Sequence, residues 1–120
     1  MYLTLTDLTF QYDDNQLISS FSCSIEKGTI TAVLGNSGSG KSTLLRLISG
    51  LEKPVEGSMI LDEKVVFDKN VFIEAHNRQI GLVFQDYALF PHLSVRKNIE
   101  YGIRKSSYQR KKAIVDRLLE

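Results

Sequence analysis

The sequence predicts an α/β fold in which two strands come before a buried strand, a glycine-rich loop and a helix. Residues 2–11 and 18–25 have strand-like apolar patterns and flank a turn signal at 13–15. Residues 35–42 read GNSGSGKS and match the phosphate-binding pattern G-x-x-x-x-G-K-[S/T] at every fixed position. An apolar run at 30–34 leads into this loop and a helical pattern at 43–48 leads out of it, which is the context that the pattern requires.

The elements are expected in the following order. Strands cover residues 2–11 and 18–25, and a buried strand at 29–34 enters the loop. A helix covers 41–49 and ends at Gly50, which suits a left-handed cap. A turn at 53–57 is followed by a short hairpin of 58–61 and 65–67, and then by an apolar strand at 79–84.

Beyond Pro91 the pattern becomes helical. Apolar residues recur on one face of a first helix and on one face of a second, and the serines between the helices are candidate caps for the second. The first face holds Val95, Ile99 and Ile103, the second holds Ile114, Val115, Leu118 and Leu119, and the serines are Ser106 and Ser107.

The loop at 35–42 has the chemistry of a polyphosphate site. Glycines at 35, 38 and 40 can adopt positive φ and bring the backbone N–H groups close to phosphate oxygens. The helix that follows adds unpaired N–H groups and the positive end of its dipole. Lys41 is expected to reach the β- and γ-phosphates, and the Ser42 hydroxyl to bind Mg²⁺.

Composition limits the alternatives. The 120 residues suit one domain, and a net charge of +1 gives no strong attraction to nucleic acid. A single cysteine, Cys23, allows no internal disulfide and fits a buried strand position better than a reactive thiol. The sequence has no apolar run of about 20 residues and no signal-peptide pattern at its start, so a reducing cytoplasmic setting is expected.

Two further features have ordinary explanations. Residues 96–120 hold eight Lys or Arg and three acids, which fits solvated helix faces, the alternative being a surface near anionic lipid headgroups. His76 and His92 have no third metal ligand spaced nearby, so exposed or hydrogen-bonded histidines are expected rather than a metal site.

Three stretches together indicate a family. The first is the loop at 35–42, followed by STLLRLISGL at 42–51 and Pro54-x-x-Gly57. The second is IGLVFQDYALFPHLSV at 80–95. The third is Asn98-Ile99-x-Tyr101-Gly102. Over essentially its whole length the chain resembles the nucleotide-binding subunit of ATP-binding-cassette (ABC) importers. It looks most like the branch that serves ferric iron, molybdate, sulfate, polyamines and some sugars.

The resemblance implies a P-loop NTPase fold with an N-terminal antiparallel β subdomain, of which these residues are an incomplete, N-terminal part. Residues 1–34 would form the β subdomain and the strand into the loop, and 35–50 the loop and its helix. Residues 51–85 would form the hairpin and the strand to the glutamine loop, and 86–120 the start of the helical subdomain.

The resemblance also implies ATP and Mg²⁺ as cofactors and assigns roles to residues. Tyr12 would stack on adenine. Gln85 would position Mg²⁺ and the attacking water, and would share the catalytic role with Lys41. Ser42 and Gln85 would be the metal ligands. The phosphate chain would be bound by Gly35, Asn36, Ser37, Gly38, Ser39, Gly40, Lys41, Ser42 and Thr43.

Partners are implied in the same way. Residues 86–95 resemble the segment that grips a short helix of the membrane subunit, where Phe90, Pro91 and Leu93 would be apolar contacts; taken alone, these residues could equally be core. A second nucleotide-binding subunit and a place on the inner face of the cell membrane are implied, and no nucleic acid.

Other parts of the family's machinery do not occur in these 120 residues: a Leu-Ser-Gly-Gly-Gln signature, a strand ending in Asp-Glu, and the histidine that senses the γ-phosphate. Residues 59–63 (MILDE) imitate the second motif but occupy the slot of a peripheral hairpin with Asp62 at the bend. Little or no ATPase activity is therefore expected from this chain alone. The unpaired apolar strands are expected to make it prone to aggregation.

Two alternatives remain open. One is a non-catalytic fragment that binds nucleotide or docks on a membrane subunit. The other is a different phosphate-loop protein, such as a GTPase or helicase, against which the segment around Gln85 argues. Residues 65–73 lean faintly toward the molybdate or ferric-iron types of importer.

Overall fold

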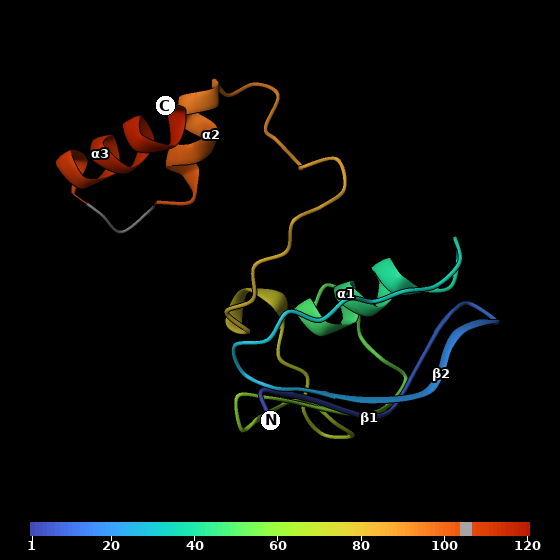
Figure 1. Ribbon diagram of the computed structural model, residues 1–120. Helices are drawn as coiled ribbons and strands as arrows, with labels where there is room; N and C mark the ends of the chain where they lie inside the picture. The colour runs from blue at the N-terminus through green and yellow to red at the C-terminus, as the bar shows by residue number, and fades with distance from the viewer. Residues whose placement is uncertain (104–106) are drawn as a thin grey trace. The chain divides into compact units, whose positions relative to one another are not determined.

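The computed structural model describes residues 1–103 and 107–120 (Figure 1). The chain divides into two compact units, Met1–Leu82 and Val83–Glu120, and each is described by itself. No helix among the described residues is long and apolar enough to cross a membrane.

The first unit is built on a four-stranded antiparallel sheet with the strand order β2-β1-β3-β4. The strands are β1 (Leu3–Tyr12), β2 (Asn15–Ile25), β3 (Glu56–Leu61) and β4 (Lys64–Phe67). Helix α1 (Lys41–Ser49) lies over one face of the sheet (Figure 1). The antiparallel β part, the helix after the loop and the short hairpin are therefore confirmed.

The core lies between α1 and the sheet. Leu44 and Leu47 of α1 are buried against apolar side chains from all four strands. These side chains are Leu3, Leu5, Leu8, Phe10, Ile18, Met59, Leu61, Val66 and Phe67. Cys23 packs half-buried at the edge of this core, where burial raises the pKa of its thiol, so it behaves as a structural residue.

Strand β1 contains a bulge that the apolar pattern did not reveal. Leu3 and Leu5, which have odd residue numbers, face the core, and so do Leu8 and Phe10, which have even numbers. In a regular strand these two pairs would lie on opposite faces. The register with β2 shifts between Leu5 and Leu8, and Asp7 has a φ of 49°. One extra residue in the strand keeps all four apolar side chains on the same face.

Helix α1 ends as its sequence predicts. Gly50 adopts a φ of 81°, and its N–H donates to Leu47 O at 3.1 Å. The N–H of Leu51 donates to Arg46 O at 2.9 Å, so the last carbonyls of the helix are paired in a left-handed glycine cap.

Two expected strands are wrong: residues 29–34 and 79–84 are not strands in the structure. No described strand pairs with either segment, and backbone in extended form counts as a strand only when a neighbour completes the ladder. Ile30 and Leu34 are 101% and 90% exposed, so their apolar side chains lack the burial that their sequence predicts.

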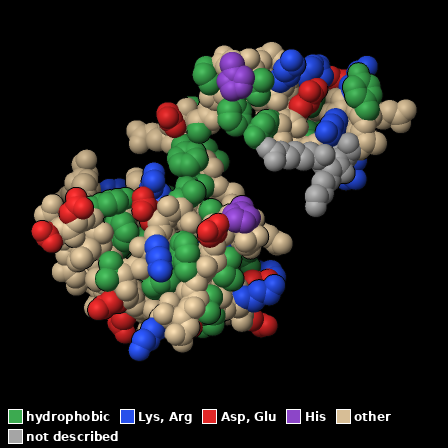
Figure 2. All heavy atoms as spheres, turned by 180° about the vertical axis from the view of Figure 1, so that it is seen from behind, with side chains coloured by type: hydrophobic (Ala, Val, Ile, Leu, Met, Phe, Trp, Pro, Cys, Tyr) green, Lys and Arg blue, Asp and Glu red, His purple; other side chains and the backbone are tan. Residues whose placement is uncertain are grey.

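The second unit contains α2 (Val95–Tyr101) and α3 (Tyr108–Leu119), which an ion pair joins at 2.8 Å between Arg96 Nη2 and Asp116 Oδ1. Ser94 caps α2 by accepting from Lys97 N at 3.3 Å. Ser107 occupies the cap position of α3, while Ser106 lies outside the described residues. Figure 2 shows basic side chains gathered on the visible face of this helical unit.

Candidate functional site

Residues 35–40 form the loop that leads into α1, and Lys41 and Ser42 begin the helix, as the sequence predicts. Gly38 and Gly40 have φ values of 80° and 89°, which is the region that glycine enters without steric cost. Gly40 is the N-cap of α1, and a Cβ there would lie 3.3 Å from Leu17 Cγ. The loop therefore lies against β2, and a side chain at Gly40 would press on Leu17 of this strand.

The expectation for Gly35 needs a correction, because its φ is not positive. Its requirement for glycine comes from a close approach within the loop instead. A Cβ on Gly35 would lie 2.7 Å from Ser39 Oγ, and the loop also closes through Ser39 N, which donates to Asn36 O at 3.2 Å. A side chain at Gly35 would therefore displace the Ser39 hydroxyl, which accepts from Lys41 Nζ.

The ammonium of Lys41 lies over the loop backbone. Nζ donates to Asn36 O at 2.7 Å, to Gly35 O at 2.9 Å and to Ser39 Oγ at 3.4 Å. A lysine ammonium has three donors and all three have partners here, so the charge is held at the mouth of the loop. Phosphate oxygens are stronger acceptors than these carbonyls, and the contacts can be exchanged for them.

The start of α1 is open to an anion. No described side chain caps its first turn, and the turn holds no acidic residue. The first backbone N–H groups of a helix have no partner inside the helix and carry the positive end of its dipole. Together with Lys41, they make the loop a positively polarised cradle that fits a phosphate chain.

Ser42 and Thr43 differ in what they can offer. Ser42 is exposed, so its hydroxyl is accessible to a metal ion. Thr43 is buried, and only its backbone N–H is left for a phosphate. The predicted binding of phosphate by Thr43 would therefore use its backbone N–H and not its side chain.

Tyr12 ends β1 and is held by two contacts. Its hydroxyl donates to Glu52 Oε1 at 3.2 Å, and its ring meets Phe10 edge to face at 4.7 Å between centroids. Glu52 also accepts from Arg46 Nη2 of α1 at 3.1 Å, which links the tyrosine to the helix of the loop. The ring is half-exposed, and the hydrogen bond from its hydroxyl to Glu52 fixes its orientation.

Gln85 lies in the second unit, in an exposed turn where Tyr87 N donates to Phe84 O at 3.0 Å. The structure describes this unit separately from the loop. The approach of Gln85 to Ser42 and Lys41 thus stays a prediction.

Arg78 is a residue whose importance the sequence pattern did not reveal. It is 4% exposed, and its Nη1 donates to Leu47 O at 2.8 Å and Ile48 O at 3.0 Å, at the end of α1. Its Nε donates to Ile73 O at 2.6 Å. A cation at this end of a helix complements the negative end of the dipole. A lone arginine in a polar stretch carries no periodic signal that could have predicted this burial.

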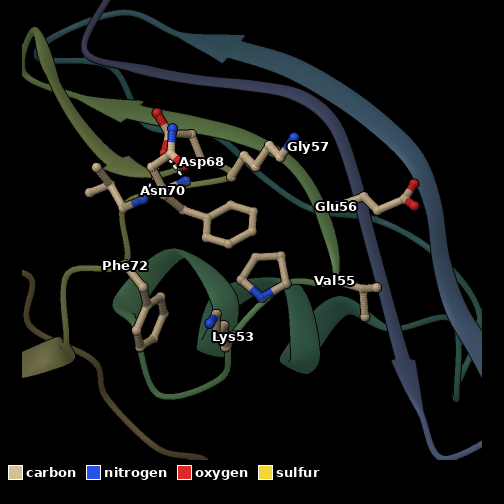
Figure 3. Close-up of a pocket in the computed structure, with 11 residues that line it drawn as sticks. Lys53, Val55, Glu56, Gly57, Asp68, Asn70 and Phe72 are labelled. Carbon is tan, nitrogen blue, oxygen red and sulfur yellow. Dashed lines mark hydrogen bonds between the residues drawn. The ribbon is translucent and has the colours of Figure 1, made fainter.

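The loop has its own small cavity, lined by apolar residues of β2 and of the segment at 33–34 together with Gly35, Ser39, Gly40 and Lys41. A larger cavity of about 440 Å³ lies elsewhere in the first unit, between residues 53–57 and 67–72 (Figure 3). There Asp68 Oδ1 already accepts from Asn70 N and Val71 N at 2.7 Å each. Its lining holds two lysines, Lys53 and Lys69, and two acids, Glu56 and Asp68, so it is not polarised for a phosphate.

The two histidines have ordinary surroundings. His76 is exposed and lies 3.4 Å from Glu74, while the His92 ring meets Phe90 at 5.9 Å. No group of three His, Cys, Asp or Glu among residues 1–103 and 107–120 could hold a metal ion. Asp62 and Glu63 form the turn between β3 and β4 with φ values of 45° and 66°, so residues 59–63 are the hairpin that was expected.

Comparisons with known proteins give a consistent result. A family model described as ABC transporter matches residues 18–120. The sulfate/thiosulfate import ATP-binding protein CysA of Synechococcus elongatus is 43% identical over 120 residues, covering 98% of this chain and 34% of the relative. The Fe(3+) ions import ATP-binding protein FbpC of Yersinia enterocolitica is 43% identical over 109 residues, covering 91% and 31%.

A solved structure agrees with these relatives. CbiO1 of Clostridium perfringens, part of an ABC transporter complex, superposes with a TM-score of 0.77 at 30% identity. The match covers 98% of this chain and 49% of that one. The chain spans about a third of the length of the curated relatives that it matches.

Proposed function

The chain belongs to the ABC transporter family, and on that premise we propose that it is the ATP-binding part of an importer ATPase. The whole protein would use ATP hydrolysis to energise the uptake of a small solute or ion across the cytoplasmic membrane. The observation that carries the proposal is the Lys41 ammonium, held at the mouth of the loop next to the uncapped start of α1.

The residues present fit a nucleotide with Mg²⁺. Lys41 and the backbone N–H groups of the loop and of α1 would bind the phosphate chain, and the exposed Ser42 hydroxyl would bind the metal ion. Tyr12 would offer its ring to adenine, with its hydroxyl kept in place by Glu52. The role of Gln85 in positioning the metal ion and the water is implied by the family resemblance.

The bound nucleotide supplies the phosphoryl group that is transferred to water. The chain's own contribution is positioning and charge, because catalysis of phosphoryl transfer consists mostly of both. The glycines keep the backbone close to the phosphates, and Lys41 offsets negative charge. The neutral amide of Gln85 can orient a water molecule without adding charge.

The partners follow from the same premise. A membrane subunit would dock on residues 86–95, where Leu89 is 68% exposed, Phe90 and Pro91 are exposed and Leu93 is half-buried. The exposure of this segment favours a contact surface over core. A second nucleotide-binding subunit would complete the ATPase on the inner face of the cell membrane.

The substrate of the whole importer is open between the classes of its relatives, of which one is named for sulfate and thiosulfate and another for Fe³⁺. Both are 43% identical to this chain, so overall identity does not rank them. Ferric iron and molybdate are the classes to test first, because the stretch at 65–73 leans toward them.

The experiment is ATP-dependent uptake by liposomes that hold the full-length protein together with its membrane subunit. We expect uptake with ATP and magnesium, and its loss in Lys41→Ala. Lys64→Ala, which removes an exposed lysine of β4, is the matched control and keeps full uptake. Uptake that persists in Lys41→Ala, or that proceeds without ATP, would exclude the proposal.

A further inference from the structure

The short loop before α2 is held by one side chain, Asn98. Its Oδ1 accepts from Phe90 N at 2.9 Å. Its Nδ2 faces three carbonyl oxygens, those of Phe90 at 3.2 Å, Leu93 at 3.1 Å and Ser94 at 3.1 Å. We call residues 90–94 the clamped loop, because both ends of this segment are bound by the same amide.

The clamped loop is also shaped by its own backbone. Leu93 N donates to Phe90 O at 3.1 Å, which closes a four-residue turn with Pro91 in its second position. His92 does not have a positive φ, so the turn is of type I, in which proline is favoured at this place. Ser94 then caps α2, and Asn98 N donates to Ser94 O at 2.9 Å. The loop passes directly into the helix that carries its clamp.

The ring of Phe90 is held by the same helix. It packs against Tyr101 of α2 with 4.6 Å between centroids and an angle of 48° between the planes. The backbone of Phe90 is fixed by Asn98 and its ring by Tyr101, one helical turn apart on α2. Leu89, just before this anchored residue, is left 68% exposed.

An amide is the side chain that fits this position. The clamp needs an acceptor for one N–H and donors toward three carbonyls. A neutral amide offers an acceptor oxygen at one end and two N–H donors at the other, and at least one of these donors is shared between two of the carbonyls. The hydrogen bonds are at the surface, where each contributes little to the stability of the fold. Their effect is to reduce the number of conformations available to the loop before a partner arrives.

We propose that Asn98 is a positioning residue that pre-organises the clamped loop for docking on the membrane subunit. This rests on the proposed function, in which residues 86–95 form the docking segment. A loop that is already ordered loses less conformational entropy on binding, so the clamp strengthens the complex without touching the partner. The partner chemistry is an apolar helical segment that covers Leu89 and the exposed part of Phe90.

The test measures the affinity of the full-length protein for its membrane subunit in nanodiscs. Asn98→Ala removes the clamp, and we expect about tenfold weaker binding. Asn98→Asp keeps the shape but replaces the donor with a carboxylate oxygen facing three carbonyls, so we expect at least an equal loss. Lys97→Ala, an exposed neighbour on α2, keeps wild-type affinity.

Amide hydrogen exchange at Phe90 gives a second readout. Its N–H is bound by Asn98 Oδ1, so we expect faster exchange in Asn98→Ala and no change in Lys97→Ala. Thermal unfolding shows whether each variant is folded. If one Asn98 variant does not fold, the affinity of the other Asn98 variant tests the proposal.

The outcomes separate two failures. If the wild-type protein binds neither ATP nor the membrane subunit, the proposed function is wrong. If wild-type protein does both, and folded Asn98→Ala and Asn98→Asp dock like it, the positioning role alone is wrong. Wild-type affinity in Asn98→Asp with a loss in Asn98→Ala would show that shape matters and the hydrogen-bond donors do not, which also overturns the proposal.

Discussion

At the scale of single residues, Arg78 is the side chain on which the setting of α1 depends most. Its guanidinium joins the last carbonyls of α1 to Ile73 O and lies 3.4 Å from Met59 Sδ of β3. Burial lowers its pKa from the ordinary value, yet an arginine remains charged at any physiological pH. The buried guanidinium of Arg78 therefore contacts helix α1, strand β3 and the segment around Ile73 at the same time.

Replacing this cation should destabilise the first unit strongly. Arg78→Ala leaves the end carbonyls of α1 without their buried donor, and we expect a loss of about 2–4 kcal/mol in the free energy of unfolding. Arg78→Lys keeps the charge but cannot reach all acceptors at once, so its loss should be about half as large. Urea denaturation measures both, with Lys69→Ala as an exposed control, and equal stabilities of Arg78→Ala and Lys69→Ala would refute the argument.

At the scale of elements, the bulge in β1 depends on a glycine across the sheet. A Cβ on Gly57 of β3 would lie 2.6 Å from Thr6 O and 2.6 Å from Asp7 O, and the φ of Gly57 is 99°. The bulged backbone therefore approaches β3 at the one position that has no side chain. The Pro54-x-x-Gly57 spacing was noted as a turn, whereas the structure gives this glycine a place in a strand.

A matched pair of substitutions separates strain from clash. Gly28 has a φ of 79° but nothing within 4 Å of its Cβ position, so Gly28→Ala should cost only about 1–2 kcal/mol of left-handed strain. Gly57→Ala adds a collision with backbone and should cost at least about 2 kcal/mol more than Gly28→Ala. Thermal or urea unfolding compares the two, and equal costs would show that the bulge relaxes freely.

How far the elements could be predicted depends on where their stabilising contacts lie. The end of α1 at Gly50 and the hairpin at 59–67 are determined by neighbours in sequence, and both were predicted. The prediction of strands at 29–34 and 79–84 was wrong, because a strand needs a neighbouring strand to pair with and the described residues provide none. Arg78 and Asn98 act through contacts that depend on the folded backbone, which no periodicity in the sequence encodes.

At the scale of the whole molecule, the chain exposes apolar segments beside a well-formed core. Ile30, Leu34 and Val83 have more than four-fifths of their surface exposed, although the sequence around them has the composition of buried strands. Exposed, extended, apolar backbone is a template for pairing with other chains. The 120-residue chain should therefore associate with itself in solution.

A charge at one of these positions should reduce that association. Ile30 is 101% exposed, so Ile30→Lys removes apolar surface without opening a cavity, and stability should change by less than about 0.5 kcal/mol. We expect slower aggregation by light scattering at equal concentration, while the conservative control Ile30→Val aggregates like the wild type. If Ile30→Lys aggregates equally fast, this segment is not the one that pairs.

The most direct test of the account is the affinity of this chain for ATP, measured by isothermal titration calorimetry with and without the Lys41 ammonium. We predict that Lys41→Ala weakens ATP binding about 10- to 100-fold, as expected for the loss of charge-assisted contacts to phosphate, while Lys64→Ala binds like the wild type. AMP, which lacks the β- and γ-phosphates, should bind weakly to all three proteins. ATP binding that is equally tight in Lys41→Ala, or no tighter than AMP binding in the wild type, would contradict a phosphate site at residues 35–42.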